Sequence, residues 1–136
     1  MPARSKARKR ALDVLYAAEL RGQDPVESLE RAIAEGDGPT NPYTETLVRG
    51  VAEHRERIDE LIGQYAQGWT LDRMPAIDRN ALRIGTFELL YADDVPDAVA
   101  VTEAVALVSN LSTDESPAFV NGVLGSMQRD RDSLVG

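Results

Sequence analysis

Hydrophobic residues recur along this chain mostly at the three-to-four-residue spacing of an α-helix. The first stripe lies in residues 3–20, where Ala11, Leu15 and Ala18 share one face, and Gly22 is placed to end that helix. The Asp24-Pro25 pair then predicts a second helix, because aspartate can cap it and proline is tolerated at its first position. The chain therefore begins with two predicted helices.

The middle of the chain predicts its longest helix and its main junction. Asn41-Pro42 repeats the cap-and-proline signal after a glycine-rich loop. From there one apolar stripe continues through His54 to Tyr65, which predicts a single helix over residues 42–65. Gly68-Trp69-Thr70 marks the expected junction between two halves, and a short helical turn is expected before Pro75.

The second half of the chain predicts three further helices. Residues 77–91 carry apolar side chains on more than one face, which predicts a central helix buried on most sides. Asp94-Val95-Pro96 breaks it, and a narrower stripe follows as far as Val108. Ser116-Pro117 then starts a last helix, and the charged tail beyond Arg129 is expected to be loose.

These patterns together predict an all-α protein with six to seven helices in two small bundles. We expect a single domain over residues 1–136, with helical subdomains at about 1–68 and 69–130 and a loose N-terminal arm. The valine-rich stretch 99–101 does not change this prediction, because one isolated strand would have no partner.

Composition supports a folded protein and excludes several classes. The chain is 43% hydrophobic and 28% charged, which is ordinary for a globular domain and unlike a disordered one. It has no cysteine, so neither a disulfide scaffold nor a thiolate metal site is expected. No apolar run approaches the roughly 20 residues of a membrane span, and no signal peptide is recognised. A cytoplasmic protein without membrane contact is expected.

Charge is distributed very unevenly along the chain. The first ten residues hold five of the fifteen basic side chains and no acidic one, whereas the remainder holds ten basic and twenty-three acidic side chains. The segments therefore carry +5 and −13. A cationic arm on an acidic body suits a polyanion bound at one end, although a solvated terminus is the commoner reason for a basic tail.

Candidate catalytic residues are few. His54 is the only histidine and lies on an apolar stripe, where a structural role is more common than a catalytic one. Carboxylates such as Asp93-Asp94 lack the spacing of a calcium loop, and Gly122 to Gly125 lack the lysine of a phosphate loop. We expect no enzyme, no metal and no cofactor.

The basic arm is the stronger candidate for function. If it is helical, Arg4 and Arg8 share one face, and so do Lys6 and Arg10. An arginine-containing cluster can hold phosphates and stack on bases, and the arm lacks the large apolar residues that a membrane helix would need. Phe119, in the first turn of the last helix, either stacks an RNA base or anchors its helix, and spacing alone favours the anchor.

Four strings spread over the chain resemble the NusB family. They are Arg8-Lys9-Arg10-Ala11-Leu12-Asp13-Val14-Leu15-Tyr16, Ile77-Asp78-Arg79-Asn80-Ala81-Leu82-Arg83-Ile84, Asp94-Val95-Pro96 followed by Thr102-Glu103-Ala104-Val105, and Phe119-Val120-Asn121-Gly122-Val123-Leu124. The resemblance implies two perpendicular helical bundles. It also implies an antitermination factor that, together with the ribosomal small-subunit protein NusE, binds the boxA element of ribosomal RNA operon transcripts. Such a factor helps RNA polymerase to read through terminators.

The resemblance also implies residue roles. The RNA-binding residues would be Arg4, Lys6, Arg8, Lys9, Arg10, Glu115 and Phe119. The NusE-binding residues would be Tyr16, Asp72 and Asp78. Under this resemblance Phe119 contacts a base, and Glu115 tunes the affinity. An acidic body suits a basic ribosomal partner, because opposite charges speed and orient docking.

Two alternative functions and the oligomeric state also need to be considered. One is a protein–protein adaptor of the transcription or ribosome-assembly machinery that does not bind RNA. Another is the NusB-like domain of certain ribosomal RNA methyltransferases, which the absence of a cofactor-binding βαβ pattern disfavours. Some family members self-associate through the RNA-binding face, and the sequence leaves open whether this chain forms such a homodimer.

Overall fold

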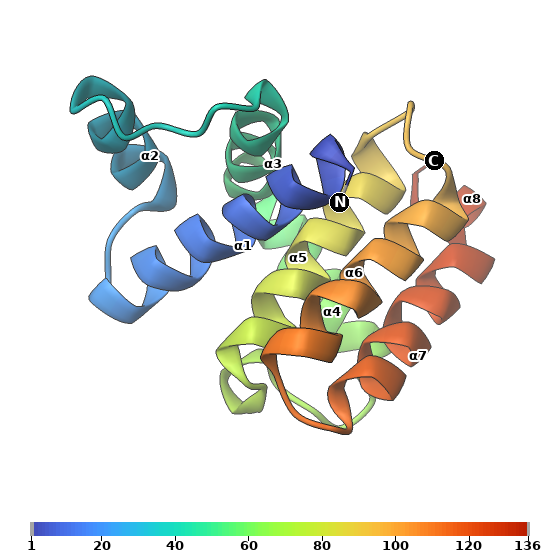
Figure 1. The fold of residues 1–136 in the computed structure, drawn as a ribbon. Coiled ribbons are helices and arrows are strands. Elements are labelled where there is room, and N and C mark those ends of the chain that lie inside the picture. Colours follow the sequence, from blue (N-terminus) through green and yellow to red (C-terminus); the bar gives the residue numbers. More distant parts are fainter. Residues whose placement is uncertain (1, 136) are drawn as a thin grey trace. The chain divides into compact units, whose positions relative to one another are not determined.

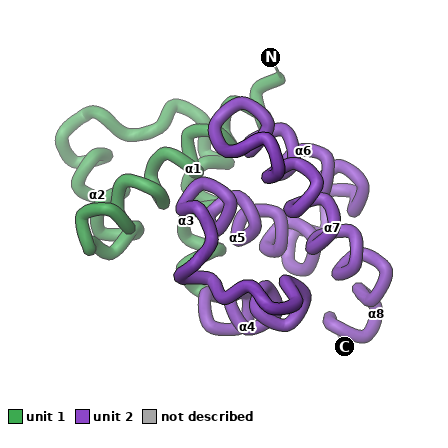
Figure 2. The backbone as a smooth tube through the Cα atoms, turned by 90° about the horizontal axis from the view of Figure 1, so that it is seen from below, with its two compact units in different colours: residues 1–53 green, residues 54–136 purple. Residues whose placement is uncertain are grey.

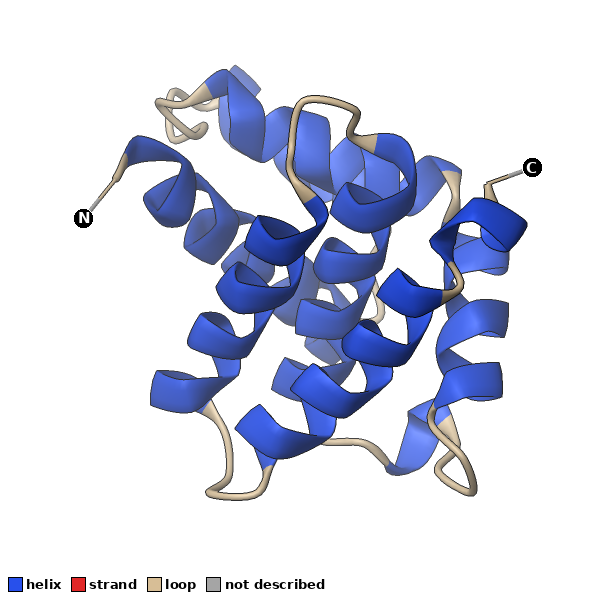
Figure 3. Cartoon of the chain, turned by 90° about the vertical axis from the view of Figure 1, so that its right-hand side faces the viewer, coloured by secondary structure: helices blue, strands red, loops and turns tan. Residues whose placement is uncertain are grey.

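All regular structure in residues 2–135, which the computed structural model describes, is helical (Figures 1 and 3). The elements are α1 (Ala3–Arg21), α2 (Pro25–Ala34), α3 (Pro42–Glu53), α4 (Arg55–Tyr65), the 3-10 turn η1 (Leu71–Arg73), α5 (Ala76–Tyr91), α6 (Asp97–Leu111), α7 (Ser116–Arg129) and α8 (Arg131–Leu134). The all-α prediction is confirmed. None of the helices in this range is both long and apolar enough to cross a membrane.

The helices form two compact units (Figure 2). The first unit is Met1–Glu53 and the second is His54–Gly136. The boundary therefore lies fifteen residues before the junction that the sequence suggested after residue 68.

In the first unit, α1 packs against α2 and α3. Its buried face includes Ala11, Leu12 and Leu15, which follow the predicted stripe. As expected, Gly22 ends α1 in a left-handed conformation with φ of 64°, which glycine adopts without strain. Asp24 then caps α2, because its carboxylate accepts a hydrogen bond from the backbone N–H of Val26 at 2.8 Å.

The predicted single helix over residues 42–65 is wrong, because the chain breaks at His54. The backbone of His54 has φ of −104° and ψ of 18°, and its ring stacks on that of Tyr91 with 3.8 Å between the ring centroids. The apolar stripe is continuous in sequence but belongs to two cores. Its α3 part packs in the first unit against α1 and α2, whereas its α4 part packs in the second unit against α5 and α7.

In the second unit, α5 is the central helix and packs against α4, α6, α7 and α8. Twelve of its sixteen residues are buried, as the sequence predicted for this segment. An ion pair fastens α5 to α4, because the guanidinium of Arg83 donates from Nε and Nη2 to the two carboxylate oxygens of Asp59, at 2.8 and 3.1 Å. The side chain of Arg83 is almost fully buried, and such two-point contacts fix geometry as well as charge.

Gly85 lets α5, α6 and α7 approach one another closely. A Cβ atom placed on Gly85 would lie 2.6 Å from Cδ1 of Leu124 on α7 and 3.0 Å from Cβ of Ala104 on α6. Both distances are shorter than ordinary van der Waals contact, so only glycine fits here without movement of the neighbours.

The basic residues Arg4 to Arg10 lie in the first part of α1, in agreement with the helix predicted from residue 3 and not with a loose arm. The amide of Asn41 donates to the carbonyl of Ala3 at 3.3 Å. The tail after Arg129 forms α8, where the Nε of Arg131 donates to the carbonyl of Leu89 at 2.9 Å. Hydrogen bonds to residues distant in sequence, within the same unit, therefore hold Ala3 and Arg131 in place.

Tyr65 connects the end of α4 to the end of α7. Its hydroxyl donates to the carboxylate of Asp130 at 2.6 Å. This hydrogen bond raises the pKa of Tyr65, because the bond and the adjacent negative charge both favour the protonated phenol.

We expect Gly85→Ala to lower the free energy of unfolding by about 1–3 kcal/mol, because the added methyl group overpacks the contact with Leu124 and Ala104. Urea unfolding measures this difference. The matched control is Gly125→Ala on α7, where a Cβ would meet nothing within 4 Å and where alanine should stabilise the helix by about 0.5–1 kcal/mol. Equal effects of the two changes would contradict the close approach at Gly85.

Candidate functional site

The basic residues of the arm lie on the first two turns of α1 and differ in exposure. Lys6, Lys9 and Arg10 are exposed and lie on one side of the helix. Arg4 is also exposed, but Arg8 has only 4% of its surface accessible. The predicted five-residue cluster is therefore a four-residue exposed cluster, and Arg8 belongs to the packed side of α1.

An aromatic ring on α3 explains how Arg4 and Arg8 share one face. The guanidinium carbon of Arg4 lies 4.1 Å from the ring centroid of Tyr43, and that of Arg8 lies 5.7 Å from it. The negative face of an aromatic ring attracts cations, so Tyr43 offsets part of the repulsion between two like charges four residues apart. The sequence offered no signal for this role, because Tyr43 and Arg4 are far apart along the chain.

Lys6 and Arg10 border a hollow between α1 and the loop that precedes α3. The hollow has a volume of about 400 Å³ and also includes Pro39, Thr40 and Asn41. The guanidinium of Arg10 donates to the backbone carbonyl of Asp37 at 3.2 Å, which holds the side chain along this loop. Nearby, the ammonium of Lys9 lies 3.6 Å from the carboxylate of Asp13. This side of α1 thus offers cations beside backbone and hydroxyl groups.

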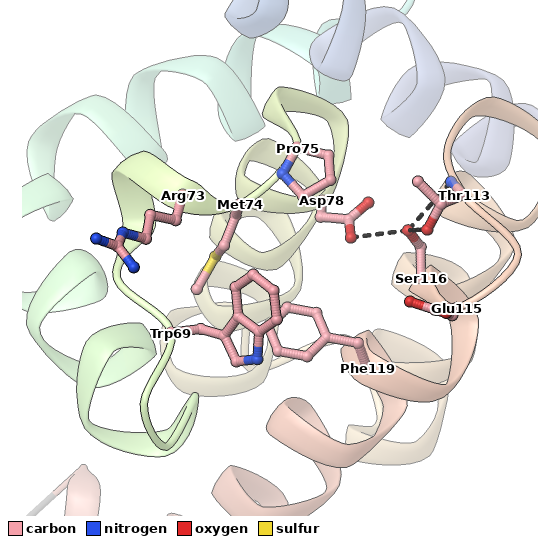
Figure 4. Close-up of a pocket in the computed structure, with 9 residues that line it drawn as sticks. All are labelled: Trp69, Arg73, Met74, Pro75, Asp78, Thr113, Glu115, Ser116 and Phe119. Carbon is pink, nitrogen blue, oxygen red and sulfur yellow. Dashed lines mark hydrogen bonds between the residues drawn. The ribbon is translucent and has the colours of Figure 1, made fainter.

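In the second unit, the predicted residues Phe119, Glu115 and Asp78 meet around a second hollow, which we call the aromatic hollow (Figure 4). Its volume is about 410 Å³. The residues that surround it are Trp69, Arg73, Met74, Pro75, Asp78, Thr113, Glu115, Ser116 and Phe119. They come from the loop before η1, from η1 and the residues that join it to α5, from the first turn of α5, from the loop between α6 and α7, and from the start of α7.

Two aromatic rings form one side of the aromatic hollow. The indole of Trp69 meets Phe119 edge to face, with 6.2 Å between ring centroids and an interplanar angle of 61°. Trp69 is 53% exposed, and Phe119 is half-buried. Phe119 is therefore not a core anchor, and both rings present accessible surface.

Asp78 organises the opposite side of the aromatic hollow. Its carboxylate accepts hydrogen bonds from the hydroxyls of Ser112, at 2.6 Å, and Ser116, at 2.8 Å. The Ser116 oxygen in turn accepts from the backbone N–H of Thr113 at 3.2 Å. One carboxylate at the start of α5 thus fixes the end of α6, the connecting loop and the start of α7.

Arg79 holds the other edge of the aromatic hollow. Its Nη1 donates to the backbone carbonyls of Leu71, at 2.6 Å, and Met74, at 2.9 Å. These bonds tie η1 to the first turn of α5, because Arg79 is on that turn. The segment from Trp69 to Pro75 is thereby fixed against α5.

The three predicted partner-binding residues differ in accessibility. Asp72, on η1, is exposed, and Tyr16, on α1, is half-buried. Asp78 departs from the expectation of a surface residue, because it is only 3% exposed and both its oxygens accept hydrogen bonds within the unit. A charge reversal at Asp78 would therefore disturb this unit itself and is no clean test of partner binding.

Sequence reasoning missed two residues of these surfaces. Trp69 was interpreted only as part of a junction, although a lone tryptophan in a short loop is itself a signal for a binding surface. Tyr43 had no recognisable signal. Among the described residues, no group of three histidines, aspartates or glutamates could hold a metal ion.

The geometry defines an all-helical protein that presents a cationic helix and an aromatic hollow. Residues 5–129 match the NusB family. The chain is 72% identical to the transcription antitermination protein NusB of a Nocardioides species, over 98% of this chain and 99% of that protein. It is 57% identical to that of Thermobifida fusca, over 96% of this chain and 92% of that protein. The chain therefore belongs to the NusB family.

Solved structures agree with this assignment. The fold is similar to NusB of T. maritima, with a TM-score of 0.84 and 31% identity over 96% of this chain and 93% of that one. It is also similar to a chain in the crystal structure of the antitermination factors NusB and NusE in complex with double-stranded RNA. There the TM-score is 0.80 and the identity 31%, over 93% of this chain and 96% of that one.

We expect Asp78→Ala to lower the free energy of unfolding by about 1–3 kcal/mol, because the hydroxyls of the buried Ser116 and the half-buried Ser112 lose their acceptor. Thermal or urea unfolding measures this loss. The control is Asp114→Ala in the same loop, where the aspartate is exposed and should change stability by less than about 0.5 kcal/mol. If the two variants were equally stable, the hydrogen bonds of Asp78 would not be holding the loop.

Proposed function

We propose that this protein is an RNA-binding transcription antitermination factor. In this proposal it binds the boxA element of ribosomal RNA operon transcripts together with the ribosomal protein NusE. The bound complex joins RNA polymerase and promotes read-through of terminators. The observation that carries the proposal is the exposed cationic face of α1 in a chain whose remainder has a net charge of −13.

The charge distribution supports RNA at α1. Four exposed cations lie in the first ten residues, and no acidic residue precedes Asp13. A phosphate backbone binds such a cluster with release of counterions, which makes the affinity fall as salt rises. The helix fixes the spacing of Lys6, Lys9 and Arg10, so less side-chain and backbone freedom is lost on binding than from a flexible tail.

The aromatic hollow supports a base contact in addition to phosphate contacts. Phe119 offers accessible ring surface for stacking, as sequence-selective RNA recognition commonly requires. Glu115 is exposed beside it and repels phosphates, so it opposes unspecific binding of the RNA backbone at this hollow. We therefore propose that α1 contacts phosphates and that the aromatic hollow contacts a base.

The acidic surface supports a basic protein partner. The chain beyond the arm carries −13, and the solved complex of a similar chain contains NusE. Asp72 is the exposed acid among the predicted partner residues, and the half-buried Tyr16 adds a ring at the surface of α1. Asp78 acts in this proposal from inside, because it holds the loop that joins α6 to α7.

Binding of boxA RNA and of a scrambled RNA of equal length, with and without NusE and across a salt series, tests the proposal. We expect selective binding of boxA RNA that NusE strengthens. Equal and weak binding of both RNAs, whether or not NusE is present, would favour the protein–protein adaptor instead.

Neutralising Lys6, Lys9 and Arg10 together to alanine should weaken boxA binding and flatten its salt dependence. Each lost phosphate contact reduces the slope of log K against log salt by about 0.7 for a single strand, so the loss should be about 2. The control is a triple alanine variant at three other exposed arginines, Arg31, Arg49 and Arg57. The same slope for both variants would show that the α1 cations take no part in binding.

Asp72→Lys should weaken association with NusE and slow its rate, because it replaces an exposed negative charge facing a basic partner. Surface plasmon resonance at low and moderate salt measures both quantities. Asp93→Lys makes the same charge change in the exposed loop between α5 and α6 and should have a smaller effect. If Asp72→Lys associates like the unchanged protein, Asp72 lies outside the interface.

A further inference from the structure

We infer that the aromatic hollow is a pocket for one unstacked nucleobase and that Trp69 forms its principal stacking wall. This inference rests on the proposed function, because it names the part of the RNA that the hollow takes. It adds a residue to which neither the family resemblance nor the sequence pattern assigned a role.

The exposure of Trp69 makes its ring accessible to a base. Trp69 is 53% exposed and borders a hollow, where an indole offers a large flat apolar surface together with an N–H donor. Phe119 meets it edge to face rather than covering it (Figure 4). The exposed face of the indole is therefore open to a flat ring, which is the shape of a nucleobase.

The polar groups of the hollow suit the edge of a base. Glu115 brings an exposed carboxylate to the hollow, and the exposed Thr113 adds a hydroxyl, whereas both oxygens of the buried Asp78 are already used inside the unit. Carboxylates repel phosphate, but they accept hydrogen bonds from the amino and imino groups of base edges. The hollow therefore suits a base with donor groups on its edge better than it suits the RNA backbone.

The exposed side chain of Arg73 also supports a nucleotide at the hollow. Its side chain comes from η1 and points away from the two rings, toward the outside of the hollow (Figure 4). A guanidinium in that position can hold the phosphate of a nucleotide whose base lies inside, because arginine binds phosphate through two hydrogen bonds. Base and phosphate would then contact different sides of the same entrance.

The wall is rigid before any ligand arrives. Gln67 and Gly68 have positive φ values of 38° and 87°, which turn the chain sharply after α4. The backbone N–H of Trp69 then donates to the carbonyl of Ala66 at 3.4 Å, and Arg79 fixes the segment that follows. A stacking surface held in advance loses little freedom on binding.

Intrinsic fluorescence tests the inference directly, because Trp69 is the only tryptophan in the chain. A short single-stranded RNA that contains boxA should change the emission of Trp69 on binding, and the change should saturate together with binding measured by anisotropy. Saturated binding with unchanged emission would overturn the inference.

A second experiment combines protein and RNA variants. Trp69→Ala should weaken boxA binding roughly 5- to 100-fold, as for loss of one base stack, whereas Trp69→Phe should keep most of the affinity. Each boxA nucleotide is then replaced in turn by an abasic one. We expect one position at which removal of the base weakens binding to the unchanged protein but has no further effect on Trp69→Ala.

The outcomes separate the inference from the proposed function. If the unchanged protein binds boxA no better than scrambled RNA, the proposed function fails and the inference fails with it. If it binds selectively but Trp69→Ala binds equally well and no abasic position is coupled to it, only the inference fails. If Trp69→Ala weakens association with NusE and leaves RNA binding intact, the hollow takes a protein side chain and the inference is overturned.

Discussion

The burial of α5 is the constraint on which the second unit depends. A helix with twelve of sixteen residues buried must provide a partner for each polar side chain that it carries inside. In the described residues, no buried side-chain nitrogen or oxygen lacks a hydrogen-bond partner. The polar residues of α5 meet this requirement by fastening neighbouring elements: Arg83 fastens α4, Asp78 fastens the loop between α6 and α7, and Arg79 fastens η1.

These hydrogen bonds from α5 also position the residues of the candidate site. Phe119 and Glu115 stand at the start of α7, whose position Asp78 sets through Ser116. Trp69 stands before η1, whose position Arg79 sets. A surface built in this way is positioned by buried polar groups, so changes inside α5 alter the site even though few of these residues face the solvent.

Helix positions could be predicted from the sequence wherever a local signal existed. Gly22, Asp24 and Asn41-Pro42 mark the ends of helices through their own backbone preferences, and the structure places helix ends there. The break at His54 could not be predicted, because periodicity records which residues are apolar and not which core they join. The short helix after Arg129 was missed for a related reason, since the carbonyl of Leu89 that holds Arg131 is distant in sequence.

For the candidate site, the sequence indicated which residues could bind RNA or a partner, but not which of them are exposed or what they contact. Five basic residues in ten identified the arm, but only the fold separates the buried Arg8 from the exposed Lys6, Lys9 and Arg10. The resemblance identified Asp78, and its internal role depends on two serines more than thirty residues away. The role of Trp69, a loop residue, could be recognised only from the fold, because it depends on the nearby ring of Phe119 on α7.

The division of the chain between Glu53 and His54 places α1, the proposed RNA-binding helix, in the first unit. The first unit has the smaller hydrophobic core, and it also contains α1 with the exposed cations. A small core resists local opening less than a large one, and a ligand that binds only the closed form raises the free energy of opening. RNA bound along α1, as proposed, would therefore protect the amide hydrogens of the first unit from exchange.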